Sequence, residues 1–199
     1  TIEQALANSC NCAFGAIALE LGADTLAEYA EKLGITQELE MDGITIPAGN
    51  FDKAEAGSIG LAWSGIGQYN NLVVPYALVR YVAAIANGGS VYEPTLLGHG
   101  SLDRETQLLS ADTAARIAEM MNHNVQTAYG GQYTFPGLNV SAKTGTAEVG
   151  DGTSHAWMTG FLNDAEHPYA FVVLVEHAGG GLTNAAPIVN QVLQAAVAA

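Results

Sequence analysis

The chain has 199 residues, of which 49% are apolar and 13% charged, with 20 acidic residues against 6 basic ones. A net charge of −14 excludes the basic patch that nucleic acids or anionic lipid surfaces require, and it is typical of a soluble surface. No apolar run approaches the roughly 18 residues of a membrane span. The longest run, residues 169–175, has the length of a strand, and the whole chain suffices for one packed domain.

The first part of the chain, residues 1–125, is predicted to be mainly helical. From Thr1 to Leu33, apolar side chains recur every three or four residues, and Gly22 and Gly34 are placed to end helices. Residues 35–60 are turn-rich, and irregular segments of that length usually cover or frame a site.

Two more helices are predicted before the sheet region. One opens at Pro75 and is apolar on nearly all sides, which indicates a buried helix that ends before Asn87. Short extended pieces are expected in residues 90–97. The second helix has Ser110 as its N-cap and Asp112 in its first turn.

The last part of the chain, residues 138–199, is predicted to hold a sheet and a closing helix. Residues 139–149, 156–162 and 170–175 are strand-like, and their short links indicate antiparallel hairpins. A helix follows from Pro187, with Ile188, Val192 and Leu193 on its apolar side. The predicted fold class is therefore α+β, one domain with an antiparallel sheet, a C-terminal helix packed on it and a helical region before it.

Neither cysteines nor histidines predict a metal or cofactor site. Cys10 and Cys12 are two residues apart, so on a helix they point away from each other, which favours small packed side chains over a disulfide or a zinc site. Gly65-Ile66-Gly67 lacks the rest of a dinucleotide fingerprint. No metal-ligand spacing occurs among the histidines, which are His99, His123, His155, His167 and His177.

The sharpest local feature is Lys143-Thr144-Gly145-Thr146 inside a predicted strand. The strand places Thr144 and Thr146 on one side and Lys143 and Gly145 on the other. A lysine charge, two hydroxyls and an open glycine backbone suit a ligand that carries a carboxylate. The alternative is an ordinary edge strand with an exposed lysine.

A second feature is Ser9-Cys10-Asn11, near the start of the helical region. Alone, these side chains are explained by local capping hydrogen bonds. Together, however, Ser-x-Asn and a later Lys-Thr-Gly resemble two of the three motifs of the β-lactamase and penicillin-binding group. Residues 4–11 with Phe14, residues 65–68, residues 84–89 and His155-Ala156-Trp157 are also similar to stretches of the penicillin-binding transpeptidase domain. The resemblance runs from Gln4 to about Val197 and implies a partial β-lactamase/transpeptidase-like fold.

The resemblance implies a role for each matching residue. Ser9 would relay protons, and Asn11 would bind the substrate amide. Lys143 would give the cleft its positive potential, while Thr144 and Thr146, with Gly145 between them, would hold the terminal carboxylate of a D-Ala-D-Ala stem peptide or of a β-lactam. The N–H of Thr146 would be an oxyanion donor. Each of these roles, and the binding of stem peptides and β-lactams, would require the complete domain.

The family's remaining motif, Ser-x-x-Lys, lies N-terminal to Ser-x-Asn, supplies the nucleophilic serine and is absent from this sequence. The chain has three lysines, and the residues three positions before them are Tyr29, Asn50 and Val140. Only eight residues precede Ser9. We therefore expect the chain to be part of a longer protein and to be inactive alone, with its exposed core covered by the missing N-terminal part, a partner chain or a dimer.

The implied parent is a peptidoglycan D,D-transpeptidase at the extracytoplasmic face of the bacterial membrane, anchored upstream of this chain. A serine β-lactamase or D,D-carboxypeptidase of the same fold is an alternative, although Cys10 stands where β-lactamases have Asp. A non-catalytic binding or sensor module is another. Glu148 is explained equally well as a solvated strand end, and Trp63 and Trp157 as core or cleft wall.

Overall fold

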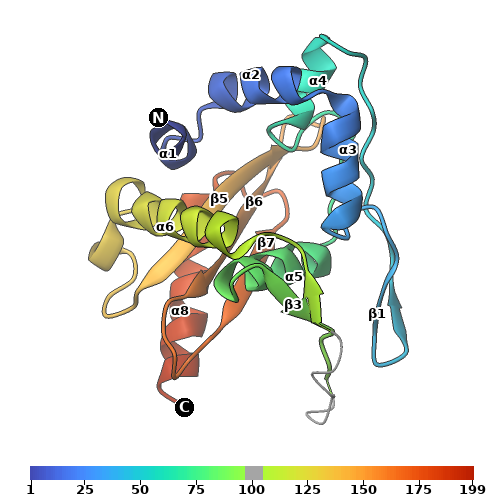
Figure 1. The fold of residues 1–199 in the computed structure, drawn as a ribbon. Helices are drawn as coiled ribbons and strands as arrows, with labels where there is room; N and C mark the ends of the chain where they lie inside the picture. The colour runs from blue at the N-terminus through green and yellow to red at the C-terminus, as the bar shows by residue number, and fades with distance from the viewer. Residues whose placement is uncertain (97–104) are drawn as a thin grey trace.

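A computed structural model of the chain describes residues 1–96 and 105–199 (Figure 1). The predicted helical start forms three helices: α1 (Ile2–Ala7), α2 (Asn11–Leu21) and α3 (Ala23–Lys32). The chain bends between them at Ser9, with φ of 49°, and at Gly22, with φ of 83°. A capping box between Thr1 and Gln4 fixes the beginning of α1.

The turn-rich segment contains a small hairpin that the sequence did not predict. Strands β1 (Leu39–Met41) and β2 (Ile44–Ile46) pair antiparallel. Each is only three residues long, too short for an alternating pattern to stand out. Helix α4 (Ile59–Ser64) follows, and the Ser58 hydroxyl caps it by accepting from the N–H of Leu61.

Helices α5 (Pro75–Ala86) and α6 (Ala111–Ala128) confirm the two predicted helices, with Pro75 and Ser110 at the predicted ends. Between them, β3 (Ser90–Tyr92) pairs antiparallel with β4 (Glu105–Gln107). Of the predicted extended residues 90–97, the structure shows a strand at Ser90–Tyr92. Leu97 and His99 lie outside the described residues. A short 3-10 helix, η1 (Gly131–Tyr133), follows α6.

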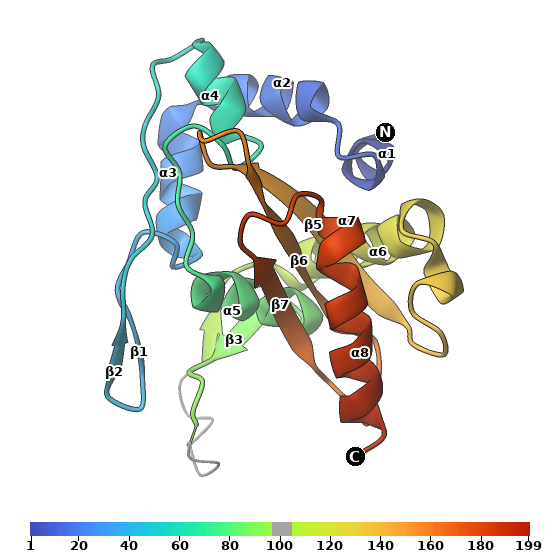
Figure 2. The same cartoon turned by 180° about the vertical axis from the view of Figure 1, so that it is seen from behind.

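The main sheet has three antiparallel strands, in the order β5 (Val140–Glu148), β6 (Ser154–Leu162), β7 (Ala170–Val175). In this register Lys143 pairs with Thr159, and Gly145 with Trp157. A short helix α7 (Gly181–Asn184) leads into α8 (Ala186–Val197), which crosses one face of the sheet (Figure 2). The predicted α+β fold with a C-terminal helix packed on the sheet is confirmed.

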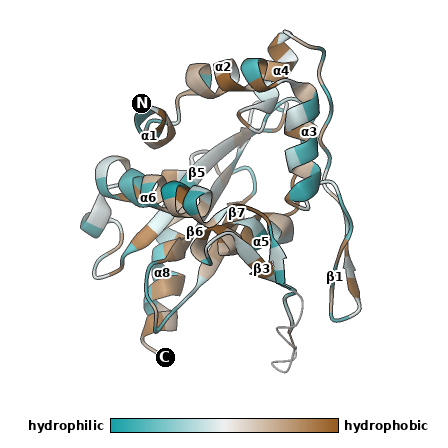
Figure 3. Cartoon of the chain, viewed as in Figure 1, coloured by the Kyte–Doolittle hydropathy of each residue, from teal (hydrophilic) through white to brown (hydrophobic). Residues whose placement is uncertain are grey.

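Each face of the sheet has its own core. On one face, α8 buries Val189 and Leu193 against Val140 and Met158. On the other, Phe161 packs against Val82 of α5 and Met121 of α6. Helix α6 keeps hydrophilic residues on its outer side while hydrophobic residues gather around β6 behind it (Figure 3). No helix in the described ranges is long and apolar enough to cross a membrane.

Helix α8 is rotated relative to the predicted orientation. Val189 and Leu193 face the core, whereas Ile188 and Val192 are exposed, so their predicted place on the packed side is wrong. Pro187 lies in the first turn, and the buried stripe begins at Ala186. All three candidate residues are apolar, so the pattern alone did not fix which of them touches the sheet.

This orientation gives a matched pair of variants. Leu193→Ala removes a side chain that is 3% exposed and should lower the free energy of unfolding by about 2–4 kcal/mol. Val192→Ala, one residue away and 57% exposed, should change it by less than about 0.5 kcal/mol. Urea denaturation measures both, and equal losses would contradict the orientation of α8.

Candidate active site

Strand β5 is an edge strand, and α6 covers only the first half of its free edge. The Asn122 amide donates to the carbonyl of Val140 at 3.0 Å, and the Asn124 amide donates to that of Ala142 at 3.1 Å. The Tyr129 hydroxyl, at the end of α6, accepts from the N–H of Thr144 at 3.3 Å. The even-numbered residues of β5 therefore direct their N–H and C=O groups to this edge.

Beyond Thr144 the edge is open. Strand periodicity directs the backbone groups of Thr146 and Glu148 to the same edge, and no helix or strand of the described chain pairs with them there. Unpaired N–H and C=O groups at a strand edge are a template for another extended chain. The edge at residues 146–148 can therefore accept a peptide.

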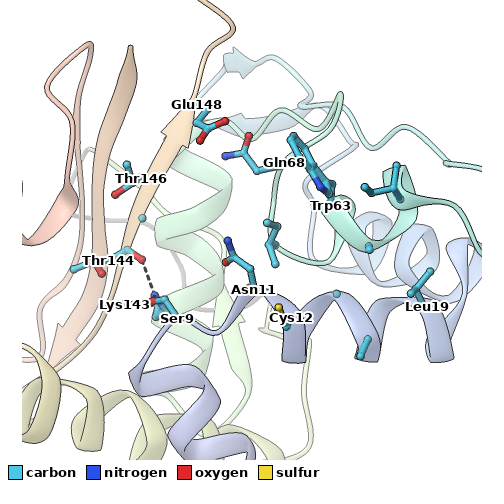
Figure 4. A pocket seen from close by; sticks show the side chains of 16 residues that line it. Ser9, Asn11, Cys12, Leu19, Trp63, Gln68, Lys143, Thr144, Thr146 and Glu148 are labelled. Atoms are coloured by element: carbon cyan, nitrogen blue, oxygen red, sulfur yellow. Dashed lines mark hydrogen bonds between the residues drawn. The ribbon is translucent and has the colours of Figure 1, made fainter. Parts of the chain in front are cut away.

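Lys143 joins this strand to the break between α1 and α2. Its ammonium group donates to the Ser9 hydroxyl at 2.5 Å and to the carbonyl of Thr144 at 2.8 Å (Figure 4). Helix α1 packs on α6, and α2 packs on α4, so the segment that carries Ser9 is held beside β5 from two sides. The two motifs found in the sequence are thus in direct contact.

Ser9 has a backbone conformation that is unusual for its residue type. Its φ is 49°, in the left-handed region, which costs a non-glycine residue about 1 kcal/mol. The N–H of Cys10 donates to the carbonyl of Ala5 at 2.8 Å, which ends the first helical segment. The bend at Ser9 then lets α2 start at Asn11 in a new direction. The Ser9 side chain is thereby turned toward Lys143.

A cavity of about 700 Å³ opens at this contact. It brings together all six residues predicted from the sequence, which are Ser9, Asn11, Lys143, Thr144, Gly145 and Thr146. Apolar side chains of Leu19, Ile59 and Trp63 also line the cavity. Leu19 and Trp63 lie across it from β5 (Figure 4). Trp63 therefore belongs to the cleft wall rather than to the core.

The predicted alternation along β5 is visible, with Lys143 directed toward α2 and the threonines away from it (Figure 4). The hydroxyl of Thr144 lies 3.3 Å from the Tyr129 hydroxyl, so α6 already engages it. Thr146 is exposed at the open edge. Of the two threonines, Thr146 is the better placed for a ligand.

Gly145 is tightly packed on one side only. A Cβ at Gly145 would meet only Trp157, at 3.2 Å, so the strand stays open toward the cavity. Behind it, a Cβ at Gly181 would come within 2.6 Å of the Gly145 carbonyl oxygen and would also overlap the carbonyl of Trp157. Gly181 therefore supports the site from behind. The sequence marks this position by the run Gly179-Gly180-Gly181, but the run alone does not show what it packs against.

The two cysteines are free thiols. Cys10 is half-buried, but Cys12 is exposed and lines the cavity, so the prediction of a packed side chain is wrong for Cys12. Helix α2 rests on α4 through Gly15 and Ala18, which leaves the position of Cys12 facing the open side.

His155 lies on a second cavity, of about 1090 Å³, on the same face of the sheet. Its Nδ1 accepts the backbone N–H of His177 at 3.1 Å, and the two rings meet edge to face. Nearby, hydrogen bonds from the Thr153 hydroxyl and N–H lower the pKa of Asp151. Within the described ranges, no three His, Cys, Asp or Glu side chains are grouped closely enough to hold a metal ion.

An antiparallel sheet whose edge strand carries Lys-Thr-Gly opposite a Ser-x-Asn turn defines the transpeptidase and β-lactamase-like class of domain. The family model of the penicillin binding protein transpeptidase domain matches residues 1–194. The chain belongs to this family.

Known relatives agree with this assignment. The peptidoglycan D,D-transpeptidase PbpA of Mycobacterium tuberculosis is 29% identical over 99% of this chain, which covers 44% of PbpA. Penicillin-binding protein 3 of Bacillus subtilis is 28% identical over 80% of the chain, which covers 26% of that protein. The chain thus spans less than half the length of these relatives.

Solved structures of penicillin-binding transpeptidase domains have the same fold as this chain. A D,D-transpeptidase domain from Eggerthella lenta superimposes with a TM-score of 0.84 at 26% identity, over 99% of this chain and 53% of that one. Penicillin-binding protein A of M. tuberculosis, in its imipenem acyl-enzyme complex, gives a TM-score of 0.84 at 29% identity, over 99% of this chain and 47% of that one.

The backbone strain at Ser9 can be measured separately from its hydroxyl. Ser9→Ala and Ser9→Gly both remove the contact with Lys143, but only glycine tolerates the left-handed conformation without strain. We expect Ser9→Gly to be more stable than Ser9→Ala by roughly 0.5–1 kcal/mol in urea denaturation. Equal stability of the two variants would show that the bend at residue 9 is not strained.

Proposed function

We propose that this chain forms the peptide-binding part of a peptidoglycan D,D-transpeptidase that processes D-Ala-D-Ala stem peptides in cell-wall cross-linking. The observation that carries the proposal is the contact between Lys143 and Ser9 inside a cavity bordered by the open edge of β5. A lysine and two hydroxyl side chains beside an open strand edge suit an extended peptide that ends in a carboxylate.

In this proposal the substrate pairs with β5 as an added strand. Residues 146–148 offer it backbone hydrogen bonds, and Lys143 with the Thr146 hydroxyl attracts its terminal carboxylate. The N–H of Thr146, which strand periodicity directs to the same edge, is the oxyanion donor. The open backbone at Gly145 lets the substrate approach closely.

Ser9 and Asn11 are the proposed proton-relay and amide-binding groups. Because the Ser9 oxygen accepts a hydrogen bond from the Lys143 ammonium, its own proton is free to be donated to a substrate group. The Asn11 amide can both donate and accept, as recognition of a peptide bond requires, and it is directed into the cavity (Figure 4).

We further propose that the acyl-forming serine belongs to a longer protein that contains this chain. None of the three lysines follows a serine at the required spacing. The cavity wall at Ile59, which is 78% exposed, and at Leu19 and Trp63 would then be covered by another part of the domain or by a partner chain. Such a parent would act outside the bacterial membrane, anchored upstream of this chain.

Peptide binding tests the role of Lys143. We expect N-acetyl-D-Ala-D-Ala to bind the longer protein that contains this chain, and Lys143→Met to weaken that binding about 10-fold, as the loss of one charged hydrogen bond predicts. Lys53→Met is the control, because Lys53 pairs with Asp24 on an exposed surface. Isothermal titration calorimetry follows the titration. Binding that Lys143→Met leaves unchanged would contradict the proposed carboxylate site.

Covalent labelling tests the missing nucleophile. A fluorescent penicillin should leave no covalent band on this chain in a denaturing gel, whereas a longer protein with Ser-x-x-Lys upstream should be labelled. Stable labelling of the longer protein supports a transpeptidase, and rapid loss of the label indicates a β-lactamase. A full gene product without the motif and without label would favour a non-catalytic binding module. A covalent band on the present chain would overturn the proposal.

A further inference from the structure

Tyr129, the C-cap residue of α6, places a hydroxyl group at the boundary between the covered and the open part of the β5 edge. The residue is 5% exposed, because it belongs to an apolar core cluster together with Val125 and Phe135. Its carbonyl accepts from the Thr134 hydroxyl at 2.5 Å, and the chain turns directly after it at Gly130, with φ of 87°. The hydroxyl is therefore held in place by the protein itself, before any ligand arrives.

The N–H, the hydroxyl and the carbonyl of Thr144 are all engaged inside the chain. The N–H donates to the Tyr129 hydroxyl at 3.3 Å, and the Thr144 hydroxyl donates to the same oxygen at 3.3 Å. The carbonyl accepts from the Lys143 ammonium group at 2.8 Å. A peptide that approaches β5 therefore finds neither a free N–H nor a free hydroxyl proton at residue 144.

Thr146 is the next residue of β5 whose backbone groups face this edge. It is exposed, whereas Thr144 is half-buried, and no strand of the described chain pairs with β5 on this side. A ligand that paired at Thr144 instead of Thr146 would be displaced by two residues, or about 7 Å along the strand. The engagement of Thr144 by Tyr129 therefore decides between two positions for the same ligand.

We propose that Tyr129 is a positioning residue that fixes the register in which a substrate pairs with β5. By engaging Thr144, it excludes pairing at that residue and leaves Thr146 to supply the N–H for the reacting carbonyl and the hydroxyl for the terminal carboxylate. Tyr129 is absent from the lining of both cavities, so it acts through Thr144 and not on the substrate. This inference rests on the proposed function and adds to it the residue that selects the productive register.

The kinetics of acylation by a fluorescent penicillin test the inference in the longer protein that contains this chain. The dependence of the labelling rate on penicillin concentration gives a maximal rate constant and a half-saturating concentration. Tyr129→Phe keeps the ring in the core but releases the N–H and the hydroxyl of Thr144 to the ligand. We expect both constants to fall together, about 3- to 10-fold, because the second register gains one hydrogen bond and holds penicillin where it cannot react. The ratio of the two constants should stay within about 2-fold of the wild-type ratio, because unproductive binding cancels in it.

Tyr133→Phe is the matched control. It removes the hydroxyl of a tyrosine four residues away that is 94% exposed, and it should leave both constants unchanged. Amide hydrogen exchange of the chain, followed by NMR, gives a second measurement that does not depend on catalysis. In Tyr129→Phe the N–H of Thr144 should exchange about 3- to 10-fold faster than in the wild type, as the loss of one hydrogen bond predicts.

The failures of the two proposals differ. Wild-type constants in Tyr129→Phe would overturn the register role and leave the proposed function intact. A lower maximal rate constant with an unchanged or higher half-saturating concentration would do the same, because it indicates a general distortion of the site. Exchange of the Thr144 N–H at the wild-type rate would also overturn the role of Tyr129. If the longer protein carries Ser-x-x-Lys and penicillin does not label it at all, the register role is overturned together with the proposed function.

Discussion

The partial covering of the β5 edge is the constraint on which the rest of the site depends. Asn122 and Asn124 of α6, with Tyr129 at its C-cap, bind this edge as far as Thr144, and the edge is open after it. If α6 covered the whole strand, no peptide could pair with it. If α6 covered none of it, the unpaired backbone of Val140 and Ala142 would be left against the core at a considerable energetic cost.

The sequence allowed correct prediction of the parts of the fold that depend on local patterns. Strands β5, β6 and β7 have dense β-branched and aromatic residues and short links, so both their existence and their antiparallel pairing followed. Pro75 and Ser110 marked helix ends because their conformational preferences are local. Of the site, all six predicted residues line one cavity, while their chemical roles stay a prediction.

Features set by tertiary contacts could not be predicted in this way. The left-handed backbone of Ser9 follows from the packing of α1 and α2 on different helices, and serine gives no local signal for it. Gly181 matters only because it lies behind Gly145, 36 residues earlier in the chain. Glu148 was explained equally well as a solvated strand end, and only the folded structure shows that it lines the cavity with Trp63 and Gln68. The rotation of α8 was likewise decided by the sheet.

The contact between Lys143 and Ser9 joins residues 134 positions apart. Closing so long a loop is entropically costly and is repaid only after the elements at both ends have formed. The helical layer is synthesised before the sheet, so Ser9 leaves the ribosome well before Lys143 exists to meet it. The site therefore cannot form during the early stages of folding. A nascent chain that has already folded α1 and α2 still lacks the wall of the cavity that β5 supplies until its last strands and α8 have docked.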